Sequence, residues 1–521
     1  MDEKKHTNYI FIAMIMYTFL CDYIFYGLQG DFYFNGKYIF TKIATVVLCY
    51  LVIKKINDTD WNCNYGRLFK KILFVCIFIN FVWIILTYPG TWKWDDMFIL
   101  YNVSENKFYF WQHWLSSFYY MLCLQFIPIP VGVVIIQNII ISIIMANIFT
   151  ELKLRYKSRL SFLFILLLFI PSIIENNLYP IRSSICAYIE LYIIFQLILN
   201  NKKFSKLKLY FITFIASILA AWRPENLLWC IAIPMIMILL KTINIKSFSA
   251  LLLISFISFL GINYYQSYGL NKCIEHTEYG DSNEMDKYVL TGFIQPLGIL
   301  VNKEIEHKGN IENFDYINSC IDVNMMIEKG GLYSFWNGGF KKINKDDIKI
   351  LQEIYIRLIK KYPETFINER WNSFLEANNA RFVFRSTDIY DSNRPARENF
   401  KNKYFFNNSM FDTRTEVVAF LENDYNNENI YAQEINKNIN FYNVIPIICI
   451  LLVISIIEVI RKNYVILTII AVMMIKLLIL IFTIPMSVYM YIFATHLTGL
   501  GIIIYWIIAN FNKKCLLGEN K

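Results

Sequence analysis

The sequence has 521 residues, of which 56% are hydrophobic, 17% are aromatic and 17% are charged, and its mean hydropathy is +0.40. A soluble chain of this length could not bury so much apolar side chain, because soluble domains are only about 45–50% apolar even when glycine is counted. The composition therefore predicts an all-α polytopic membrane protein, for which the location of the charges matters more than the formal net charge of +9. No nucleic-acid partner is expected.

The N-terminal part contains three apolar runs, at residues 9–28, 38–53 and 72–86. We expect each run to cross the membrane. A basic cluster separates the second run from the third, and the excess of Lys and Arg in cytoplasmic loops predicts that this end lies in the cytoplasm. The cluster consists of Lys54, Lys55, Arg67, Lys70 and Lys71.

A Pro-Gly break and two adjacent carboxylates follow the third run. Residues 88–96 read Tyr-Pro-Gly-Thr-Trp-Lys-Trp-Asp-Asp. Tryptophan suits the membrane surface, because its ring is apolar and its N–H group needs a polar partner. We therefore predict a surface loop in which Asp95 or Asp96 can accept a proton from a substrate that arrives on a lipid carrier. Ordinary loop acids beside an aromatic anchor are the alternative.

Residues 108–126 are aromatic and amphipathic, and either cross the membrane or lie flat on it. We predict an interfacial helix. If this segment lies flat, the next apolar run, 131–149, delivers a second basic cluster to the same side as the first, as the positive-inside pattern requires. That second cluster consists of Lys153, Arg155, Lys157 and Arg159.

With that choice, the remaining apolar runs alternate across the membrane and give about twelve spans of roughly the required length, with both termini in the cytoplasm. These runs are 160–174, 184–199, 209–221, 227–240, 248–265, 441–460, 465–484 and 488–509. Three regions follow. Residues 1–265 form a transmembrane region with an outer-face catalytic loop at 87–127, residues 266–440 form a soluble insert, and residues 441–521 form C-terminal transmembrane helices with a short cytoplasmic tail.

The insert mixes charged and apolar residues, and we expect one extracytoplasmic α or α+β domain. A helix is expected over residues 346–361, where the apolar residues at helical spacing are Ile348, Leu351, Ile354 and Leu358. Cys273 and Cys320 also lie in the insert and form either one disulfide or two thiols. No cysteine or histidine cluster in the sequence has metal-ligand spacing, so no metal site is predicted from them.

The predicted topology places several polar residues together on the outer side of the membrane. An arginine suits a phosphate, because its planar guanidinium can donate two parallel hydrogen bonds. A carboxylate can take a proton from an acceptor hydroxyl. The combination predicts a site for a phosphate-linked donor and a hydroxyl acceptor. The residues are Asp95, Asp96, His113, Glu175, Arg182, Arg223 and Glu225, with Glu175–Ser183 expected as a loop.

Structural explanations exist for the same residues. Arg182 and Arg223 could each extend along apolar surface to the membrane interface. Arg223 and Glu225 could simply pair with each other. His113 could be a packing residue between its two neighbouring tryptophans.

The order of these features resembles the GT-C superfamily of integral-membrane glycosyltransferases, which use polyprenyl-phosphate-linked sugars. These enzymes carry an acidic residue or pair in an early extracytoplasmic loop, followed by interfacial helices, and Asp95-Asp96 with residues 108–126 match that arrangement. In a similar bacterial branch, a Pro-Gly and Asp loop precedes a His-containing segment, here at His113. Arg182 and Arg223 match two later charged positions. The resemblance covers roughly residues 74–229.

The resemblance implies transfer of a sugar from a polyprenyl-phosphate donor to a lipid, glycan or cell-surface polymer acceptor on the outer face of a bacterial plasma membrane. It implies that one of Asp95 and Asp96 is the general base, and that the other binds a metal or the sugar. Arg182 and Arg223 are expected to bind the donor phosphate, with the polyprenyl chain in a groove between spans. A divalent cation is compatible with this chemistry but is not required, because arginine alone can stabilise the leaving phosphate.

Tryptophans near the acidic pair have two readings. Trp92, Trp94 and Trp111 are expected either to stack on sugar faces or to anchor the chain at the membrane surface. Among them, Trp94 is our candidate substrate-binding residue, together with His113 and Glu225.

Two other functions are compatible with the sequence. A polysaccharide polymerase or ligase would use a glycan on a polyprenyl diphosphate and would depend on Arg370, Arg381 and Arg385 of the insert. A lipid-linked sugar flippase or other transporter predicts paired charges and broken helices near the membrane midplane. The sequence instead indicates charges at the ends of the spans, which counts against transport.

Overall fold

The computed structural model describes residues 2–27, 35–199, 204–277, 280–308, 314–324, 343–378, 411–421, 441–484 and 488–518. This described part is predominantly helical, which confirms the prediction of a helical membrane protein. It also contains one two-stranded antiparallel sheet formed by β1 (Ile274–Thr277) and β2 (Gly280–Asn283). In its register Ile274 pairs with Asn283 and Thr277 pairs with Gly280.

Residues up to 156 form long helices and two short ones. The short helices α4 and α5 lie between the third and fourth long helices of the chain. The bounds are α1 (Asp2–Gly27), α2 (Gly36–Asn57), α3 (Asn64–Leu86), α4 (Trp94–Ser104), α5 (Trp114–Leu124) and α6 (Val131–Tyr156).

The next part of the chain, up to residue 272, includes several short helical pieces. Its elements are η1 (Arg159–Phe162), α7 (Leu163–Leu166), η2 (Leu167–Phe169), α8 (Pro171–Leu178), α9 (Arg182–Leu199), α10 (Lys206–Trp222), η3 (Pro224–Asn226), α11 (Leu227–Leu239) and α12 (Ile245–Lys272).

The described elements after the sheet begin with the helices of the insert and end with three apolar helices, α22, α23 and α24. They are α13 (Glu284–Thr291), α14 (Ile294–Lys308), α15 (Phe314–Cys320), α17 (Lys345–Lys361), α18 (Pro363–Asn378), α20 (Phe411–Leu421), α22 (Ile445–Ile460), α23 (Tyr464–Thr483), η6 (Tyr489–Tyr491) and α24 (Phe493–Gly518).

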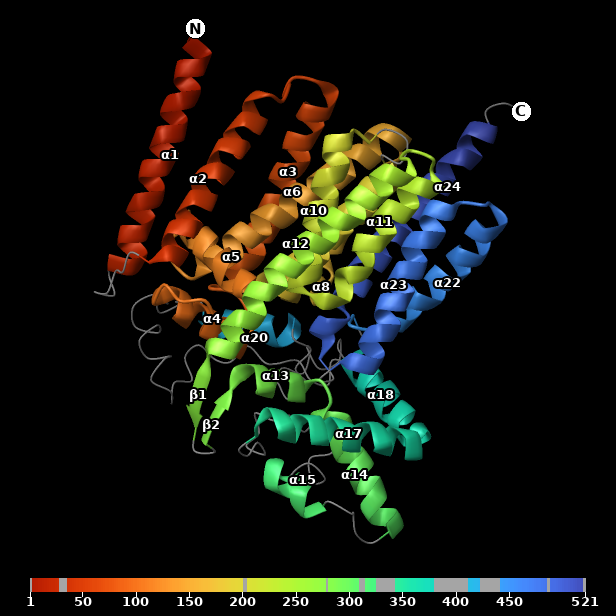
Figure 1. The fold of residues 1–521 in the computed structure, drawn as a ribbon. Helices are drawn as coiled ribbons and strands as arrows, with labels where there is room; N and C mark the ends of the chain where they lie inside the picture. Colours follow the sequence, from red (N-terminus) through yellow and green to blue (C-terminus); the bar gives the residue numbers. More distant parts are fainter. Residues whose placement is uncertain are drawn as a thin grey trace.

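Each predicted apolar run coincides with helical structure. Within the described residues, seven helices are long and apolar enough to cross a membrane, namely α1, α3, α6, α9, α12, α23 and α24. An eighth is added if residues 159–178 are counted as one bent span. Three shorter apolar helices, α5, α11 with η3, and α22, are also described, and α2 and α10 lie in the same bundle (Figure 1). The long apolar helices are those of an integral membrane protein.

The run predicted at 160–174 is not one straight helix, because it is interrupted at Pro171. The two halves, Arg159–Phe169 and Pro171–Leu178, are bent by 61°. Ile170 has an extended backbone, and Pro171 is the first residue of α8. A residue before proline disfavours helical geometry, whereas proline is well accommodated at a helix start, so the sequence itself causes this break.

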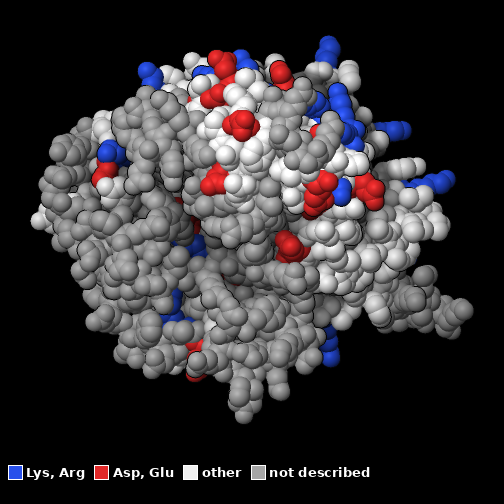
Figure 2. Space-filling model, turned by 90° about the horizontal axis from the view of Figure 1, so that it is seen from below, with Lys and Arg blue, Asp and Glu red and all other residues white. Residues whose placement is uncertain are grey.

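The two chain ends lie at the same end of the helical bundle, and helices α13 to α18 lie at the opposite end (Figure 1). These shorter helices have their own apolar core, which includes Leu290, Leu297, Ile317 and Leu351. On the described part of this face, acidic and basic side chains are interspersed (Figure 2). That mixture of charges is typical of a protein surface that is exposed to water.

The predicted helix over 346–361 is confirmed as α17, in which all four predicted apolar residues are buried. Its start is fixed by Asn344, whose side chain accepts hydrogen bonds from the first turn, while Asp347 accepts one from the Asn344 backbone. The predicted insert boundary at 266 falls inside α12, which continues to Lys272. Cys273 and Cys320 are both thiols.

The segment 108–126 differs from the helix expected there. Its helix, α5, begins only at Trp114 and has 11 residues. At about 1.5 Å per residue it is roughly half the length needed to cross about 30 Å of hydrocarbon. Eight of its residues are buried, because it packs within the protein instead of lying exposed on a membrane surface.

Candidate functional site

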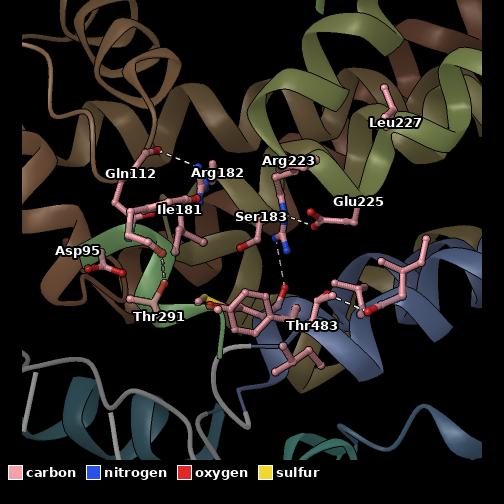
Figure 3. Close-up of a pocket in the computed structure, with 18 of the residues that line it drawn as sticks. Asp95, Gln112, Ile181, Arg182, Ser183, Arg223, Glu225, Leu227, Thr291 and Thr483 are labelled. Carbon is pink, nitrogen blue, oxygen red and sulfur yellow. Dashed lines mark hydrogen bonds and ion pairs between the residues drawn. The ribbon is translucent and has the colours of Figure 1, made fainter. Parts of the chain in front are cut away.

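A cavity of about 550 Å³ lies at the end of the bundle near α13. Its walls come from α4, the segment before α5, α9, η3 and α11, the end of α13, α23 and η6. In Figure 3, Asp95 lies on one side, the Arg223–Glu225 pair lies toward the other, and Arg182 and Ser183 lie between them. Residues far apart in the sequence are thus brought to one site.

The structure brings together four of the residues that the sequence singled out: Asp95, Arg182, Arg223 and Glu225. Helix ends account for this convergence. Asp95 is in the first turn of α4, Arg182 begins α9, and Arg223 is the residue that ends α10. Asp96 and His113 do not line the cavity, and the side chain of Trp94 lies outside the described residues.

Asp95 and Asp96 lie in a helix and not in the loop that we predicted. Helix α4 begins at Trp94, because the preceding backbone is anchored against α8. Thr91 donates its backbone N–H to the carbonyl of Leu178 at 3.1 Å. Gly90 has a φ of +107°, and a Cβ there would lie 2.8 Å from the same carbonyl oxygen. This close approach requires glycine, and it sets where α4 starts.

The two acids have different environments, because consecutive residues on a helix point about 100° apart. Asp95 lines the cavity, and its carboxylate has no hydrogen-bond partner among the described residues. Burial raises the pKa of Asp95 to about 6, against the opposing effect of the Arg182 charge. An acid with this pKa is ionised at neutral pH and remains a usable base.

Asp96 is fully buried, with an exposed fraction of 0%. The Tyr120 hydroxyl lies 3.1 Å from its Oδ1, and its Oδ2 has no partner within the described part of the chain. Burial, followed by the neighbouring Asp95 charge, raises the pKa of Asp96 well above its ordinary value. Asp96 is therefore a buried acid that supports α4 against α5 through Tyr120.

Glu175 lies in α8, so the prediction of a loop over Glu175–Ser183 is wrong for most of its length. Its carboxylate is buried and lies 2.5 Å from the ammonium of Lys93. The Lys93 ammonium also lies over the ring of Tyr179, at 4.4 Å from its centroid. This ion pair, whose two charges cancel, links the start of α4 to α8 and does not line the main cavity.

Arg182 is the cation in the cavity whose charge is not paired with a carboxylate. Its Nη1 donates to the backbone carbonyls of Gln112 at 3.1 Å and Trp222 at 3.3 Å. Across the described ranges, no carboxylate lies within ion-pair distance of its guanidinium. The two carbonyls hold the side chain in the cavity wall, with the other N–H groups available to an anion.

Ser183 adds a hydroxyl beside Arg182. It is 2% exposed, lines the cavity, and its Oγ has no hydrogen-bond partner among the described residues. Both residues belong to the first turn of α9, where backbone N–H groups lack helical partners and the helix dipole favours a negative charge. The sequence analysis missed Ser183, because nothing distinguishes it from neighbouring serines before the fold is known.

Arg223 and Glu225 form an ion pair of 2.5 Å, as the structural explanation of these residues predicted. The Arg223 guanidinium also lies over the ring of Tyr491, at 5.8 Å from its centroid. Arg223 is only 8% exposed, so it does not extend to the surface. Both residues still line the cavity, and Glu225 compensates the charge of Arg223.

His113 stabilises the start of α5. Its Nδ1 accepts the backbone N–H of Leu115 at 3.3 Å, and its ring stacks on Trp114. Burial, with a contribution from the Arg182 charge, lowers the pKa of His113 well below its ordinary value, so the ring is neutral. The structure thus favours the packing explanation over substrate binding.

The tryptophans are not equivalent. Trp92 is 0% exposed and donates its indole N–H to the carbonyl of Pro89 at 3.0 Å, so both the sugar-stacking and the surface-anchor predictions are wrong for it. Trp111 lines the cavity and meets the ring of Tyr288 edge to face at 5.5 Å. Tyr288 belongs to α13, and a single sequence carries no signal that it reaches this site.

One wall of the cavity is apolar and faces the outside of the bundle. It is formed mainly by Leu227, Leu228 and Ile231 of α11 and by Ile479 and Leu480 of α23. Ile231 and Ile479 line the cavity and are also 47% and 41% exposed on the outer surface. The cavity is therefore bordered by side chains that contact the hydrocarbon in a membrane protein.

The two aspartates do not form a pair of metal ligands, because Asp96 contacts Tyr120 while Asp95 lines the cavity. Within the described ranges, no group of three or more His, Cys, Asp or Glu side chains is placed to hold a metal ion. A divalent cation would find only the Asp95 carboxylate and Glu225, which already pairs with Arg223.

One feature contradicts the expectation that charges lie only at span ends. Lys476 of α23 and Glu190 of α9 lie within two of the long apolar helices and form an ion pair of 2.5 Å.

Of the arginines that a polymerase would use, Arg370 is buried against Glu369 and donates to the carbonyl of Ile484 at 2.7 Å. Arg381 and Arg385 lie outside the described residues.

The fold and the cavity define the class of protein: a helical membrane protein with a cavity at one end of its bundle. Among the described residues, this cavity is lined by the Asp95 carboxylate, by the Arg182 guanidinium, which pairs with no carboxylate, and by a wall of apolar side chains. Comparison with protein-family models, with curated protein sequences and with solved structures finds no match for this chain.

Proposed function

We propose that this protein is a membrane glycosyltransferase that moves a sugar from a polyprenyl-phosphate donor to a hydroxyl of a lipid, glycan or cell-surface polymer. The observation that carries the proposal is the composition of a single cavity. It combines the Asp95 carboxylate, the uncompensated Arg182 guanidinium and a wall of apolar side chains that borders the hydrocarbon. A base, a phosphate ligand and a lipid path are the parts that such a transfer needs.

The charges of the cavity favour a donor with one phosphate. Glu225 compensates Arg223, which leaves Arg182 as the cation for the ligand. A polyprenyl-phosphate sugar is a phosphodiester with a single negative charge, which Arg182, Ser183 and the first turn of α9 can bind together. A diphosphate would bring at least one further negative charge to the same cavity, without a further unpaired cation among the described side chains that line it.

The apolar wall supports a lipid-linked donor. With the phosphate at Arg182, the polyprenyl chain can leave past Ile231 and Ile479, which are exposed on the outer surface of the bundle. In a membrane the chain is already in hydrocarbon, so the wall holds it by van der Waals contacts at the position that places the phosphate at Arg182. A water-soluble nucleotide sugar would gain nothing from this wall.

Asp95 is the general base of the proposed reaction, and the structure supports this choice over Asp96. Asp95 takes the proton from the acceptor hydroxyl, and the acceptor oxygen forms a bond to the anomeric carbon. The bond between that carbon and the phosphate oxygen breaks at the same time, and polyprenyl phosphate leaves with the electron pair, stabilised by Arg182. Trp111 and Tyr288, which line the same cavity as Asp95, offer apolar ring surface to the sugar.

The proposal includes a topology of about twelve spans, with both termini in the cytoplasm and the insert after α12 outside. The positions of the chain ends support this topology, because both lie at one end of the bundle and α13 to α18 lie at the other (Figure 1). The cavity lies at the α13 end, so the proposed transfer takes place on the outer face of the membrane.

The test is a reaction with defined donors. Purified protein in nanodiscs is mixed with polyprenyl-phosphate monosaccharides and an acceptor extract, and the release of free polyprenyl phosphate is followed by mass spectrometry. We expect release from at least one donor, with the sugar recovered on an acceptor. Transfer only from polyprenyl-diphosphate glycans would instead indicate the polymerase or ligase.

A flippase or other transporter is the second candidate, because two observations favour it. The Lys476–Glu190 pair lies within the spans, and residues 159–178 form a bent helix pair, which are features that transporters use. A transporter would move a lipid-linked sugar between leaflets of a vesicle without releasing polyprenyl phosphate. The two functions are therefore separated by the same donor panel, assayed for release and for transbilayer movement.

A further inference from the structure

A buried ion pair joins α9 and α23 next to the cavity. The side chains of Lys476 and Glu190 are both 2% exposed, and Lys476 Nζ lies 2.5 Å from Glu190 Oε2. The other carboxylate oxygen accepts the indole N–H of Trp229, on α11, at 2.9 Å. The pair thus touches three helices, and each charge is compensated, as an ionisable group within a membrane requires.

The helix periodicity places this pair below the cavity. On α23, Lys476 precedes Leu480 by one turn on the same face, and Leu480 lines the cavity. On α9, Glu190 follows Arg182 by eight residues, which is about two turns. The pair therefore lies deeper in the bundle than the arginines of the cavity.

Lys476 is connected to the cavity wall through Asn226. Its Nζ lies 2.6 Å from the side-chain oxygen of Asn226, which is only 1% exposed. The backbone N–H of Asn226 donates to the carbonyl of Arg223 at 3.0 Å and closes the short turn η3. Glu225 lies within this turn, so Lys476 fixes the segment that carries the Arg223–Glu225 pair.

We propose that Lys476 and Glu190 are positioning residues, which hold the Arg223–Glu225 turn in place. The carbonyl of Trp222, next to this turn, accepts a hydrogen bond from Arg182 at 3.3 Å, so the position of the turn affects the guanidinium that binds an anionic lipid headgroup. Neither side chain lines the cavity: Lys476 acts through its contact with Asn226, and Glu190 holds Lys476 in place. A buried ion pair contributes little stability relative to apolar residues of the same volume. Its specific contribution here is the hydrogen bond to Asn226, which an apolar pair cannot provide. The choice of a polyprenyl monophosphate as the test ligand rests on the proposed function.

The chain offers a matched control in a second buried ion pair. Lys42 of α2 lies 2.5 Å from Asp22 of α1, with side chains 10% and 5% exposed. The Tyr38 hydroxyl donates to the same carboxylate at 2.6 Å. Neither residue lines the cavity. Replacing this pair by apolar residues changes the same chemistry at a distant place in the bundle.

The experiment compares three variants with the natural protein in nanodiscs. The first is Glu190→Leu with Lys476→Met, and the second is the control, Asp22→Leu with Lys42→Met. The third is Asn226→Ala, which cuts the connection but keeps the ion pair. Binding of a polyprenyl monophosphate is measured by native mass spectrometry. Hydrogen–deuterium exchange is measured for the peptide that contains residues 222–226.

We expect binding to weaken by about 10-fold or more in the first and third variants, because each loses the hydrogen bond of a charged group to the turn. Exchange of residues 222–226 should become faster in both. Combining Asn226→Ala with the first double variant should cause no further loss, since the two act through one contact. The control should match the natural protein in both measurements.

Unchanged binding and unchanged exchange in the Asn226→Ala protein would overturn the proposal, even if the double variant does not fold. If the natural protein binds no polyprenyl monophosphate, the proposed function fails. The positioning role is then tested by the hydrogen–deuterium exchange of residues 222–226 alone. Faster exchange in the first and third variants, but not in the control, would then still support positioning. Equal exchange in all of them would contradict it.

Discussion

Asp95 and Asp96 are adjacent in the sequence, but only the Asp95 carboxylate reaches the cavity, whereas Asp96 is fully buried beside the Tyr120 hydroxyl at 3.1 Å. Burial raises the pKa of Asp95 to about 6, and burial together with the Asp95 charge raises the pKa of Asp96 well above its ordinary value. Asp95 is therefore the acid available for proton transfer, whereas Asp96 is part of the support for α4.

The proposed base predicts a pH dependence of the transfer. Asp95 must be ionised to accept a proton, and burial raises its pKa to about 6. We expect kcat/KM to rise about tenfold per pH unit below pH 6 and to level off above it. Steady-state rates between pH 4.5 and 8.5 provide the measurement. A profile that stays flat through pH 6 would remove Asp95 as the base.

Substitution of Arg182 should have two linked effects. Arg182→Gln removes a charged partner of the donor phosphate, so we expect binding of polyprenyl phosphate to weaken by about 10- to 100-fold. The Arg182 charge also lowers the pKa of Asp95, so the acidic limb of the pH profile should move to higher pH. Titration of the lipid and the pH–rate profile measure the two effects.

Arg155 supplies the matched control for that substitution. It also donates to a backbone carbonyl, that of Leu199, but it belongs to the end of α6 and does not line the cavity. Arg155→Gln should leave both measurements unchanged. Equal losses in the two variants would mean that Arg182 acts only through stability.

The apolar wall predicts dependence on the length of the lipid. Ile231→Trp fills the path beside α11, so we expect KM for a long polyprenyl donor to increase about 10-fold or more, because the larger side chain blocks the path and the lipid loses its van der Waals contacts with the wall. A short, water-soluble isoprenyl donor should be affected much less. Leu253→Trp is the control, because Leu253 of α12 is 59% exposed and does not line the cavity. An equal effect on both donors would place the lipid path elsewhere.

The raised pKa of Asp95 also predicts that the difference in stability between the Asp95→Asn variant and the natural protein depends on pH. Its pKa is about 6 in the folded protein and 3.8 ordinarily, so the folded state binds this proton more tightly. The stabilisation is complete below about pH 3.9 and is lost as the pH rises through about 6. Asp95→Asn cannot ionise, so its apparent Tm relative to the natural protein should rise between pH 4 and 6 and then stay constant. A constant difference over this range would contradict the raised pKa.

The sequence predicts the helices well, because apolar runs of span length have few alternatives in a membrane protein. It also predicts that Asp95, Arg182 and Arg223 lie together, since alternation of spans places them at one end of the bundle. It cannot show that Asp96 and Trp92 are buried, because their side-chain directions follow from where α4 starts against α8.

Other parts of the site depend on long-range packing. Tyr288 and Tyr491 reach the cavity from elements that lie far from Asp95 in the sequence. Lys476, in contrast, had a signal in the sequence, because a lysine within a long apolar run is costly unless it has a partner. The identity of that partner, Glu190, could be established only from the packing of α9 against α23.

The most direct test of the central claim compares Asp95→Asn with Asp96→Asn in the donor reaction. We expect Asp95→Asn to reduce release of polyprenyl phosphate by about 10²- to 10⁴-fold, the usual contribution of a general base. Asp96→Asn replaces a buried acid that does not line the cavity by an amide of the same shape, and should retain most of the activity. Full activity in folded Asp95→Asn protein, or loss only in the Asp96→Asn protein, would contradict the account.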